Sequence, residues 1–307
     1  MTRVAAVDIG TNSIRLLVAD AERHGADTTL VPRDRRMRIT GLGAGVDASR
    51  RLAPEAVART LEVLDEYGHA IREQGATRVR ASATSAARDA ENRGDFFAAA
   101  RAALGVKPEL LSGDEEARLS FIGATGGLTD EPPPYLVVDL GGGSTEFTMG
   151  AREPEAAISI DVGCVRITEQ WLRSDPPAPE ELSQAVSVVR DHLADVERAL
   201  PALHEARTVV GLAGTITTIA AVEQGVPYSR ERIHHFRLTR DAAEDVFRTL
   251  ALEPAAERRH NPGLEPGRVD TIVGGAVVLV TVLRAFGVDE LLVSEDDILD
   301  GLVRSLA

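Results

Sequence analysis

Two short segments of this 307-residue chain share one order of residue types: an aspartate, a hydrophobic residue, a glycine, small turn residues and a serine. The first runs from Asp8 to Ser13 and the second from Asp139 to Ser144, and they align without gaps. A glycine-rich turn exposes backbone N–H groups that bind phosphate oxygens, and hydroxyls add further hydrogen bonds. The residues predicted to bind phosphate at these turns are Gly10, Thr11, Asn12, Ser13, Gly141, Gly142, Gly143, Ser144 and Thr145.

The aspartate before each turn sits at the end of a predicted strand. If the two turns face each other across a cleft, Asp8 and Asp139 can hold Mg²⁺ directly or through water and offset phosphate charge. An Asp-x-Gly turn by itself is usually only a turn. The repetition 131 residues apart is what favours a functional pair.

A third glycine-rich junction, 211–217, places backbone amides at the start of a predicted helix, which is again an anion site. Its candidate residues are Gly214 and Thr215. The alternative is that the glycine is needed only for close packing.

Acidic and basic side chains near the middle of the first half supply candidates for catalysis. Asp114, Glu115 and Glu116 open a predicted helix after Ser112, where acids suit the helix dipole, but one glutamate could instead polarise an attacking water. Arg88 follows a hydroxyl-rich segment and could clamp phosphate, or could lie on a solvated helix face.

The composition restricts the class of protein. The 34 basic and 48 acidic side chains give a net charge of −14, which argues against binding of nucleic acid or a membrane surface because both are anionic. Lys107 is the only lysine, so a lysine-containing phosphate loop or Schiff base elsewhere is excluded. Cys164 is the only cysteine and lacks a neighbouring base, which predicts a packed residue.

No segment of the sequence resembles a membrane anchor or leader. The N-terminal apolar run ends at Asp8, too early for a signal peptide, and the apolar run 277–283 is interrupted by Thr281 and followed by Arg284. We therefore expect a cytoplasmic protein.

Strands alternate with helices, which indicates an α/β fold. The Gly- and Pro-rich segment 125–134 reads as a linker, after which the strand–turn–strand pattern restarts. This predicts two related domains, 1–125 and 126–307.

The expected strands are 4–7, 14–19, one within 28–39, 78–81, 107–111, a strand before the second turn, 145–149, 156–162, 208–210 and 290–294. The first expected helix begins at Pro54. Further helices are expected at about 94–104, 163–173, 180–199 and 269–286, and two more begin near residues 112 and 296.

Six motifs in order carry a family resemblance along residues 4–303. They are the two aspartate turns, the segments 83–92 and 112–118, Gly163–Arg166 and the segment 213–216. The chain resembles the exopolyphosphatase and guanosine pentaphosphate phosphohydrolase (Ppx/GppA) family. The resemblance implies an actin-like ATPase fold of the sugar kinase, Hsp70 and actin type, with two ribonuclease H-like domains flanking a cleft.

The resemblance also implies a reaction: Mg²⁺-dependent hydrolysis of the terminal phosphoanhydride of inorganic polyphosphate, with possible action on guanosine pentaphosphate. It places the catalytic glutamate on Glu116, the metal-linked aspartate on Asp139, the acid that closes the second turn motif on Glu146, and a phosphate-binding arginine on Arg88. Mg²⁺ is then expected at Asp139, with Asp8 and Glu146 as further candidate ligands. A homodimer is common in the family. The sequence leaves open a non-catalytic sensor of guanosine tetra- or pentaphosphate, and a kinase or ATPase of the same superfamily.

The chain departs from many relatives in its last motif, 294–301. Leu299 stands where an arginine is common, and Asp300 where an acid is usual. Any phosphate contact made by that arginine is therefore lost or moved.

Overall fold

The computed structural model describes residues 1–25 and 27–307, and these form two compact units. Unit 1 comprises Met1–Gly127 together with Asp297–Ala307, and unit 2 comprises Leu128–Asp296. The predicted boundary after residue 125 lies close to this division. The residues 297–307, which the sequence placed in the second domain, pack in unit 1.

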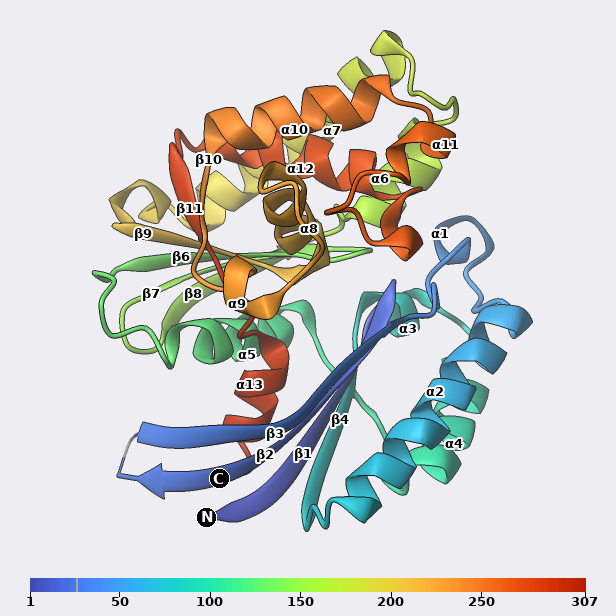
Figure 1. The fold of residues 1–307 in the computed structure, drawn as a ribbon, viewed down its shortest axis with the longest axis vertical. Coiled ribbons are helices and arrows are strands. Elements are labelled where there is room, and N and C mark those ends of the chain that lie inside the picture. The colour runs from blue at the N-terminus through green and yellow to red at the C-terminus, as the bar shows by residue number, and fades with distance from the viewer. Residues whose placement is uncertain (26) are drawn as a thin grey trace. The chain divides into compact units, whose positions relative to one another are not determined.

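Unit 1 is built on a five-stranded sheet in the order β3-β2-β1-β4-β5 (Figure 1). β1 pairs antiparallel with β2 and β2 with β3, whereas β4 runs parallel to β1 and β5 parallel to β4. The strands are β1 (Thr2–Ile9), β2 (Ser13–His24), β3 (Asp27–Ile39), β4 (Arg78–Ala83) and β5 (Glu109–Leu110).

Helices cover both faces of this sheet, which explains the unbroken apolar run of β1. Ala5, Val7 and Ile9 pack in one cluster and the alternating Val4 and Ala6 in another, as the two-residue period of a strand requires. α2 and α4 lie along the first face, and α5 and α13 along the second (Figure 1). The helices of unit 1 are α1 (Val46–Ser49), α2 (Pro54–Glu73), α3 (Ser85–Asp89), α4 (Arg93–Leu104), α5 (Gly113–Thr125) and α13 (Ile298–Arg304).

Unit 2 contains a six-stranded sheet in the order β10-β11-β9-β6-β7-β8. β6, β7 and β8 pair antiparallel in sequence, β9 runs parallel to β6 and to β11, and β10 is antiparallel to β11. The strands are β6 (Tyr135–Leu140), β7 (Thr145–Gly150), β8 (Pro154–Ile160), β9 (Thr208–Leu212), β10 (Arg237–Thr239) and β11 (Glu290–Val293).

The core of unit 2 is centred on a helix with no polar face. α12 is buried from Ile272 to Leu283, and α7, α10 and α12 lie on the same side of the sheet (Figure 1). The helices of unit 2 are α6 (Cys164–Trp171), α7 (Pro179–Ala199), α8 (Ala213–Glu223), α9 (Arg230–Ile233), α10 (Arg240–Leu252), α11 (Ala255–Arg258) and α12 (Ile272–Ala285), with short 3₁₀ turns at Leu203–Glu205 and Pro266–Arg268.

The two sheets share one topology. In each, an antiparallel meander of three strands is extended from its first strand by two further parallel strands, and β10 is an addition at the edge of the second sheet. This repeated ribonuclease H-like arrangement is that of the actin-like ATPase fold, so the predicted fold class is confirmed. Among the described residues no helix is long and apolar enough to cross a membrane.

Candidate active site

The two aspartate turns have the same backbone geometry. The Gly10 N–H donates to the Ser13 carbonyl at 3.0 Å, and the Gly141 N–H donates to the Ser144 carbonyl at 3.0 Å. A Cβ atom on Gly10 would lie 2.9 Å from the Ser13 oxygen, and one on Gly141 would lie 3.1 Å from the Ser144 oxygen. Glycine therefore fits both closely folded turns, and the predicted repeat of strand, turn and strand is confirmed.

Asp8 is buried behind the first turn and is already held by the protein. The Arg15 guanidinium donates to Asp8 Oδ2 at 2.7 Å, and the Ser82 hydroxyl donates to Oδ1 at 3.3 Å. Arg15 is paired directly opposite Asp8 in the β1–β2 ladder. Burial raises the pKa of Asp8, while the Arg15 guanidinium and its hydrogen bonds act in the opposite direction.

The first residue of α3, Ser85, packs against the first turn. Thr11 Oγ1 and Ser85 Oγ lie 2.7 Å apart, and the Gly43 N–H donates to the Thr11 carbonyl at 2.8 Å. A Cβ on Gly43 would clash with the Thr11 side chain, so this glycine admits the close contact. The first turn is thus supported on two sides by the protein.

The acids at the start of α5 have different partners. Glu115 closes a capping box with Ser112: the Ser112 N–H donates to Glu115 Oε2 at 3.0 Å, and Ser112 accepts from the Glu115 N–H. This hydrogen bond from Ser112 lowers the pKa of Glu115. Asp114 is exposed. Glu116, in contrast, has a largely buried side chain whose Oε2 lies 3.6 Å from Arg88 Nη1.

Arg88 does not lie on a solvated helix face. Its Nη1 donates to the Leu111 carbonyl at 2.9 Å, and its side chain is only 27% exposed. The segment preceding α5 therefore holds the guanidinium beside Glu116, and the structure brings together these two predicted site residues.

In unit 2, the start of α6 fixes the second turn. The Cys164 N–H donates to the Gly141 carbonyl and the Val165 N–H to the Gly142 carbonyl, while Arg166 Nε donates to the Gly143 carbonyl at 2.9 Å. The carbonyl oxygens of this turn, which would repel a phosphate, are therefore bound to donors of the protein itself.

Asp139 and Glu146 form a pair of buried carboxylates behind the second turn. They are direct partners in the antiparallel β6–β7 ladder, and Ser159 donates to Glu146 Oε1 at 2.7 Å. Carboxylate oxygens suit Mg²⁺, which is typically bound by one or two carboxylates plus water and substrate phosphates. In the described parts of the chain, no group of three or more His, Cys, Asp or Glu residues is placed to hold a metal ion. The residues present fit a metal that needs phosphate or water to complete its coordination.

The third predicted phosphate site lies where β9 meets α8. Ala213 adopts φ 69°, a left-handed conformation that costs energy in a non-glycine residue and is often found at functional sites. Thr215 is buried against Gly275 of α12, so its side chain serves packing and only backbone groups at this helix start remain candidates. Gly214 is in contact with Arg268, because an added Cβ would overlap that guanidinium.

Arg268 lies beside the third predicted phosphate site, and the sequence analysis did not single it out. It is buried, its Nε donates to Glu265 at 3.2 Å, and it lies beside both Gly214 and Cys164. The sequence does contain a signal for Arg268: it stands just before the apolar segment that forms α12, where a charged side chain is unusual. Cys164 is free and buried, as predicted, and burial raises the pKa of its thiol.

The altered final motif contributes to unit 1. Leu299 is fully buried in the core below β1 and β2, while Asp300 closes a capping box on α13 and accepts from Arg35 at 2.6 Å. An arginine at position 299 would be buried here, and Arg35 on β3 instead supplies a guanidinium to this motif.

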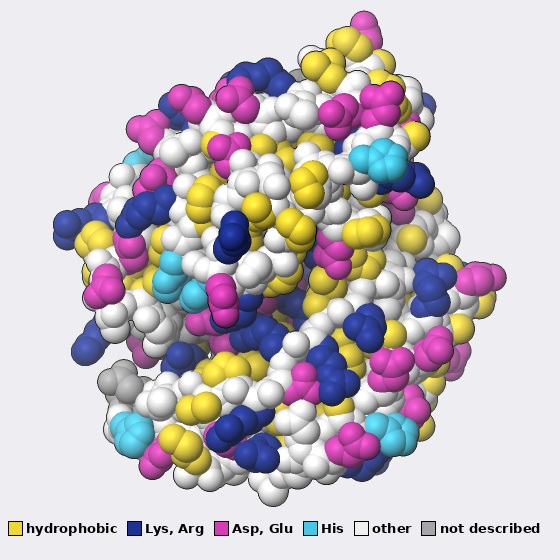
Figure 2. All heavy atoms as spheres, viewed as in Figure 1, with side chains coloured by type: hydrophobic (Ala, Val, Ile, Leu, Met, Phe, Trp, Pro, Cys, Tyr) yellow, Lys and Arg dark blue, Asp and Glu magenta, His cyan; other side chains and the backbone are white. Residues whose placement is uncertain are grey.

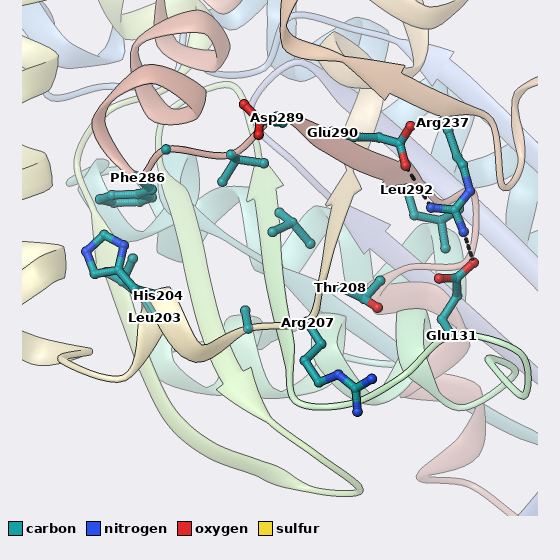
Figure 3. A pocket seen from close by; sticks show the side chains of 14 residues that line it. Glu131, Leu203, His204, Arg207, Thr208, Arg237, Phe286, Asp289, Glu290 and Leu292 are labelled. Atoms are coloured by element: carbon teal, nitrogen blue, oxygen red, sulfur yellow. Dashed lines mark hydrogen bonds and ion pairs between the residues drawn. The ribbon is translucent and has the colours of Figure 1, made fainter.

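The described residues of unit 2 also line a cavity of about 500 Å³ at the opposite end of the sheet from the second turn. It lies at the start of β9 and β11, and Arg237 bridges Glu131 and Glu290 on its wall (Figure 3). No predicted site residue lines this cavity.

Comparison with known proteins agrees with this geometry. Exopolyphosphatase 2 of Mycobacterium tuberculosis is 46% identical over all of this chain and 99% of that protein. A crystal structure of an exopolyphosphatase-like protein superposes with a TM-score of 0.93 at 38% identity over the full length of both chains. The Aquifex aeolicus PPX-GPPA enzyme superposes with a TM-score of 0.81 at 33% identity over 99% of each chain. The model of the Ppx/GppA phosphatase family matches residues 17–307. The chain therefore belongs to the Ppx/GppA phosphatase family.

Proposed function

We propose that this protein is an exopolyphosphatase, which hydrolyses the terminal phosphoanhydride of inorganic polyphosphate and releases orthophosphate. The observation that carries the proposal is the pairing of Glu116 with Arg88, next to a glutamate that is committed to capping its helix. Membership of a phosphatase family and the high identity to a mycobacterial protein named exopolyphosphatase 2 support it.

In this mechanism Glu116 accepts a hydrogen bond from the attacking water and takes its proton as the oxygen bonds to the terminal phosphorus. The bond from that phosphorus to the bridging oxygen breaks, and the shortened chain leaves with the electron pair. Arg88 binds the terminal phosphate as a charged clamp. Because its guanidinium is held by Leu111, it is pre-positioned for that contact.

The two glycine-rich turns bind further phosphates through their backbone N–H groups, with the hydroxyls of Ser13 and Ser144 beside them. The buried Thr145 hydroxyl donates to the Val162 carbonyl at 2.6 Å, and Thr11 Oγ1 lies 2.7 Å from Ser85 Oγ, so these two hydroxyls are bonded within the protein. Asp139 and Glu146 are the residues proposed to hold Mg²⁺. When bound, the ion supplies positive charge that offsets the negative charge of the phosphate oxygens.

The proposal extends to the location, the oligomeric state and a second substrate of the protein. We infer that the protein acts in the cytoplasm, forms a homodimer, and also removes the terminal phosphate of guanosine pentaphosphate. A protein that only sensed guanosine tetra- or pentaphosphate would need the turns but not Glu116.

The test is orthophosphate release from polyphosphates of defined length in the presence of Mg²⁺, beside guanosine pentaphosphate as substrate and ATP with and without an acceptor. We expect release from polyphosphate, competition by guanosine pentaphosphate, and no transfer from ATP. Calorimetric binding of guanosine tetraphosphate without release from either substrate would support the sensor and overturn the proposal. Acceptor-dependent ATP consumption would assign the chain to the kinases of its superfamily.

A further inference from the structure

The two halves of the repeat differ at one position behind the turns. In unit 2 the ladder partner of Asp139 is Glu146, another carboxylate. In unit 1 the ladder partner of Asp8 is Arg15, whose guanidinium contacts the Asp8 carboxylate at 2.7 Å. Two adjacent carboxylates attract a divalent cation, whereas a carboxylate paired with a guanidinium has its charge offset.

Arg15 is in turn held from the other side by the end of the chain. Its Nη1 donates to Asp297 Oδ2 at the N-cap of α13. Arg35 binds Asp300 at 2.6 Å and lies 3.9 Å from Asp297. Carboxylates and guanidinium groups therefore alternate from the first turn to α13, and the three carboxylates are almost completely buried.

We propose that Arg15 and Asp297 are positioning residues that fix the Asp8 carboxylate behind the first phosphate turn, and that Asp8 is not a direct metal ligand. This inference rests on the proposed function. The turn of unit 1 then binds phosphate with the Asp8 charge behind it offset by Arg15, while the proposed metal ligands are the carboxylates Asp139 and Glu146 of unit 2. Any role of Asp8 is exerted through the shape of the turn.

If these ion pairs serve only stability, another buried ion pair in the same sheet should behave in the same way, and Asp20 provides that control. Asp20 on β2 is also buried and also lies between two arginines, Arg3 at 2.8 Å and Arg33 at 2.6 Å. It is far along the strand from the turn. Loss of either carboxylate removes the same kind of interaction, but only Asp297 is connected to Asp8.

The first experiment measures metal affinity in Asp8→Asn and Asp139→Asn, using calorimetry with Mg²⁺ alone and Mg²⁺ titration of phosphate release. We expect the Asp139 variant to need at least about tenfold more Mg²⁺, and the Asp8 variant to stay within about twofold of the wild type. An equal loss of Mg²⁺ affinity in both variants overturns the proposal. The calorimetric arm needs no turnover, so an inactive wild type would refute the proposed function without deciding this point.

The second experiment compares Asp297→Asn with Asp20→Asn. Asparagine still caps α13, because its side-chain oxygen can accept from the Leu299 N–H, so the substitution removes charge and leaves the helix capped. We expect faster hydrogen exchange of amides 10–13 and a kcat/KM lowered by about tenfold or more in the Asp297 variant only. Identical exchange at the turn in the two variants would contradict the positioning role, whatever their melting temperatures.

Discussion

Positions 15 and 146 hold opposite charges at equivalent places in the repeat, and this difference separates the chemistry of the two turns. Each side chain faces an aspartate across its β-ladder. Arg15 binds Asp8 directly, whereas the residue opposite Asp139 is a second carboxylate, Glu146, and we propose these two acids as the Mg²⁺ ligands. The repeat supplies two turns of the same backbone geometry, and we propose that single residues behind them decide what else each can bind.

For Arg88, a lysine substitution tests whether the planar guanidinium group is needed or only a positive charge. Arg88→Lys keeps the charge but loses the planar fork, which donates to the Leu111 carbonyl and is proposed to bind phosphate as well, so we expect kcat/KM for polyphosphate to fall about 10- to 100-fold. Steady-state phosphate release measures this. The matched control is Arg101→Lys on the exposed side of α4, which should retain wild-type kinetics. Similar losses in both variants would argue against a specific clamp.

Cys164 gives a prediction that depends on pH. Burial raises the pKa of its thiol above the ordinary value, so the thiolate required for alkylation is scarcer in the folded state at pH 8 than in the unfolded state. Iodoacetamide should label the native protein slowly, more quickly as the pH rises, and completely in urea. Because this is the only cysteine, mass spectrometry reads the site directly. Rapid labelling of the native protein at pH 8 would place the thiol at the surface instead.

At the scale of elements, the end of the chain belongs with its beginning. Gly301 of α13 lies against α5, since an added Cβ would overlap the Leu119 carbonyl, and a Cβ added to Gly123 of α5 would overlap the Asp297 carbonyl. α5 carries Glu116, so the packing of α13 supports the helix that presents the proposed base.

We therefore expect Gly301→Ala to lower the free energy of unfolding by about 1–3 kcal/mol or more, because the methyl group has no space. The same change at Gly94 of α4, where no atom lies within 4 Å of an added Cβ, should be neutral or slightly stabilising. Urea denaturation followed by circular dichroism measures both. Equal stability of the two variants would show that α5 and α13 do not pack this closely.

The sequence was most informative where patterns are local. The two hairpins, their repeated turns and the apolar α12 follow from apolar runs and glycine placement. α10 was missed, although Ala243, Val246 and Leu250 carry a helical apolar spacing. The pairing of Arg15 with Asp297 could not be predicted, because 282 residues separate them and the local pattern of neither contains the other. Arg268 was not singled out either, although an arginine so close to the start of an apolar helix is unusual.

At the scale of the whole molecule, the net charge of −14 did not exclude a strongly anionic substrate. Figure 2 shows that both acidic and basic side chains are exposed at the surface, so the net charge does not describe any one part of it. Recognition is instead assigned to backbone N–H groups, hydroxyls, a few arginines held in place by the fold, and a divalent cation.

This assignment makes binding as well as turnover depend on metal. Treatment with EDTA should abolish phosphate release and weaken binding of polyphosphate, because the buried pair Asp139 and Glu146 then faces the phosphates without a cation. Added Mg²⁺ should restore both. Binding measured by calorimetry and release measured in parallel test this, and unchanged affinity in EDTA would contradict it.

Glu116 is the proposed base of polyphosphate hydrolysis, and a comparison of Glu116→Gln with Glu115→Gln separates this role from that of the neighbouring carboxylate. Both substitutions remove one carboxylate from the first turn of α5, and glutamine at position 115 can still complete the capping box. Orthophosphate release from polyphosphate should fall by about 10²- to 10⁴-fold in the Glu116 variant, with polyphosphate binding retained, and stay near the wild type in the Glu115 variant. Near-wild-type release by Glu116→Gln, or an equal loss in both variants, would contradict the account.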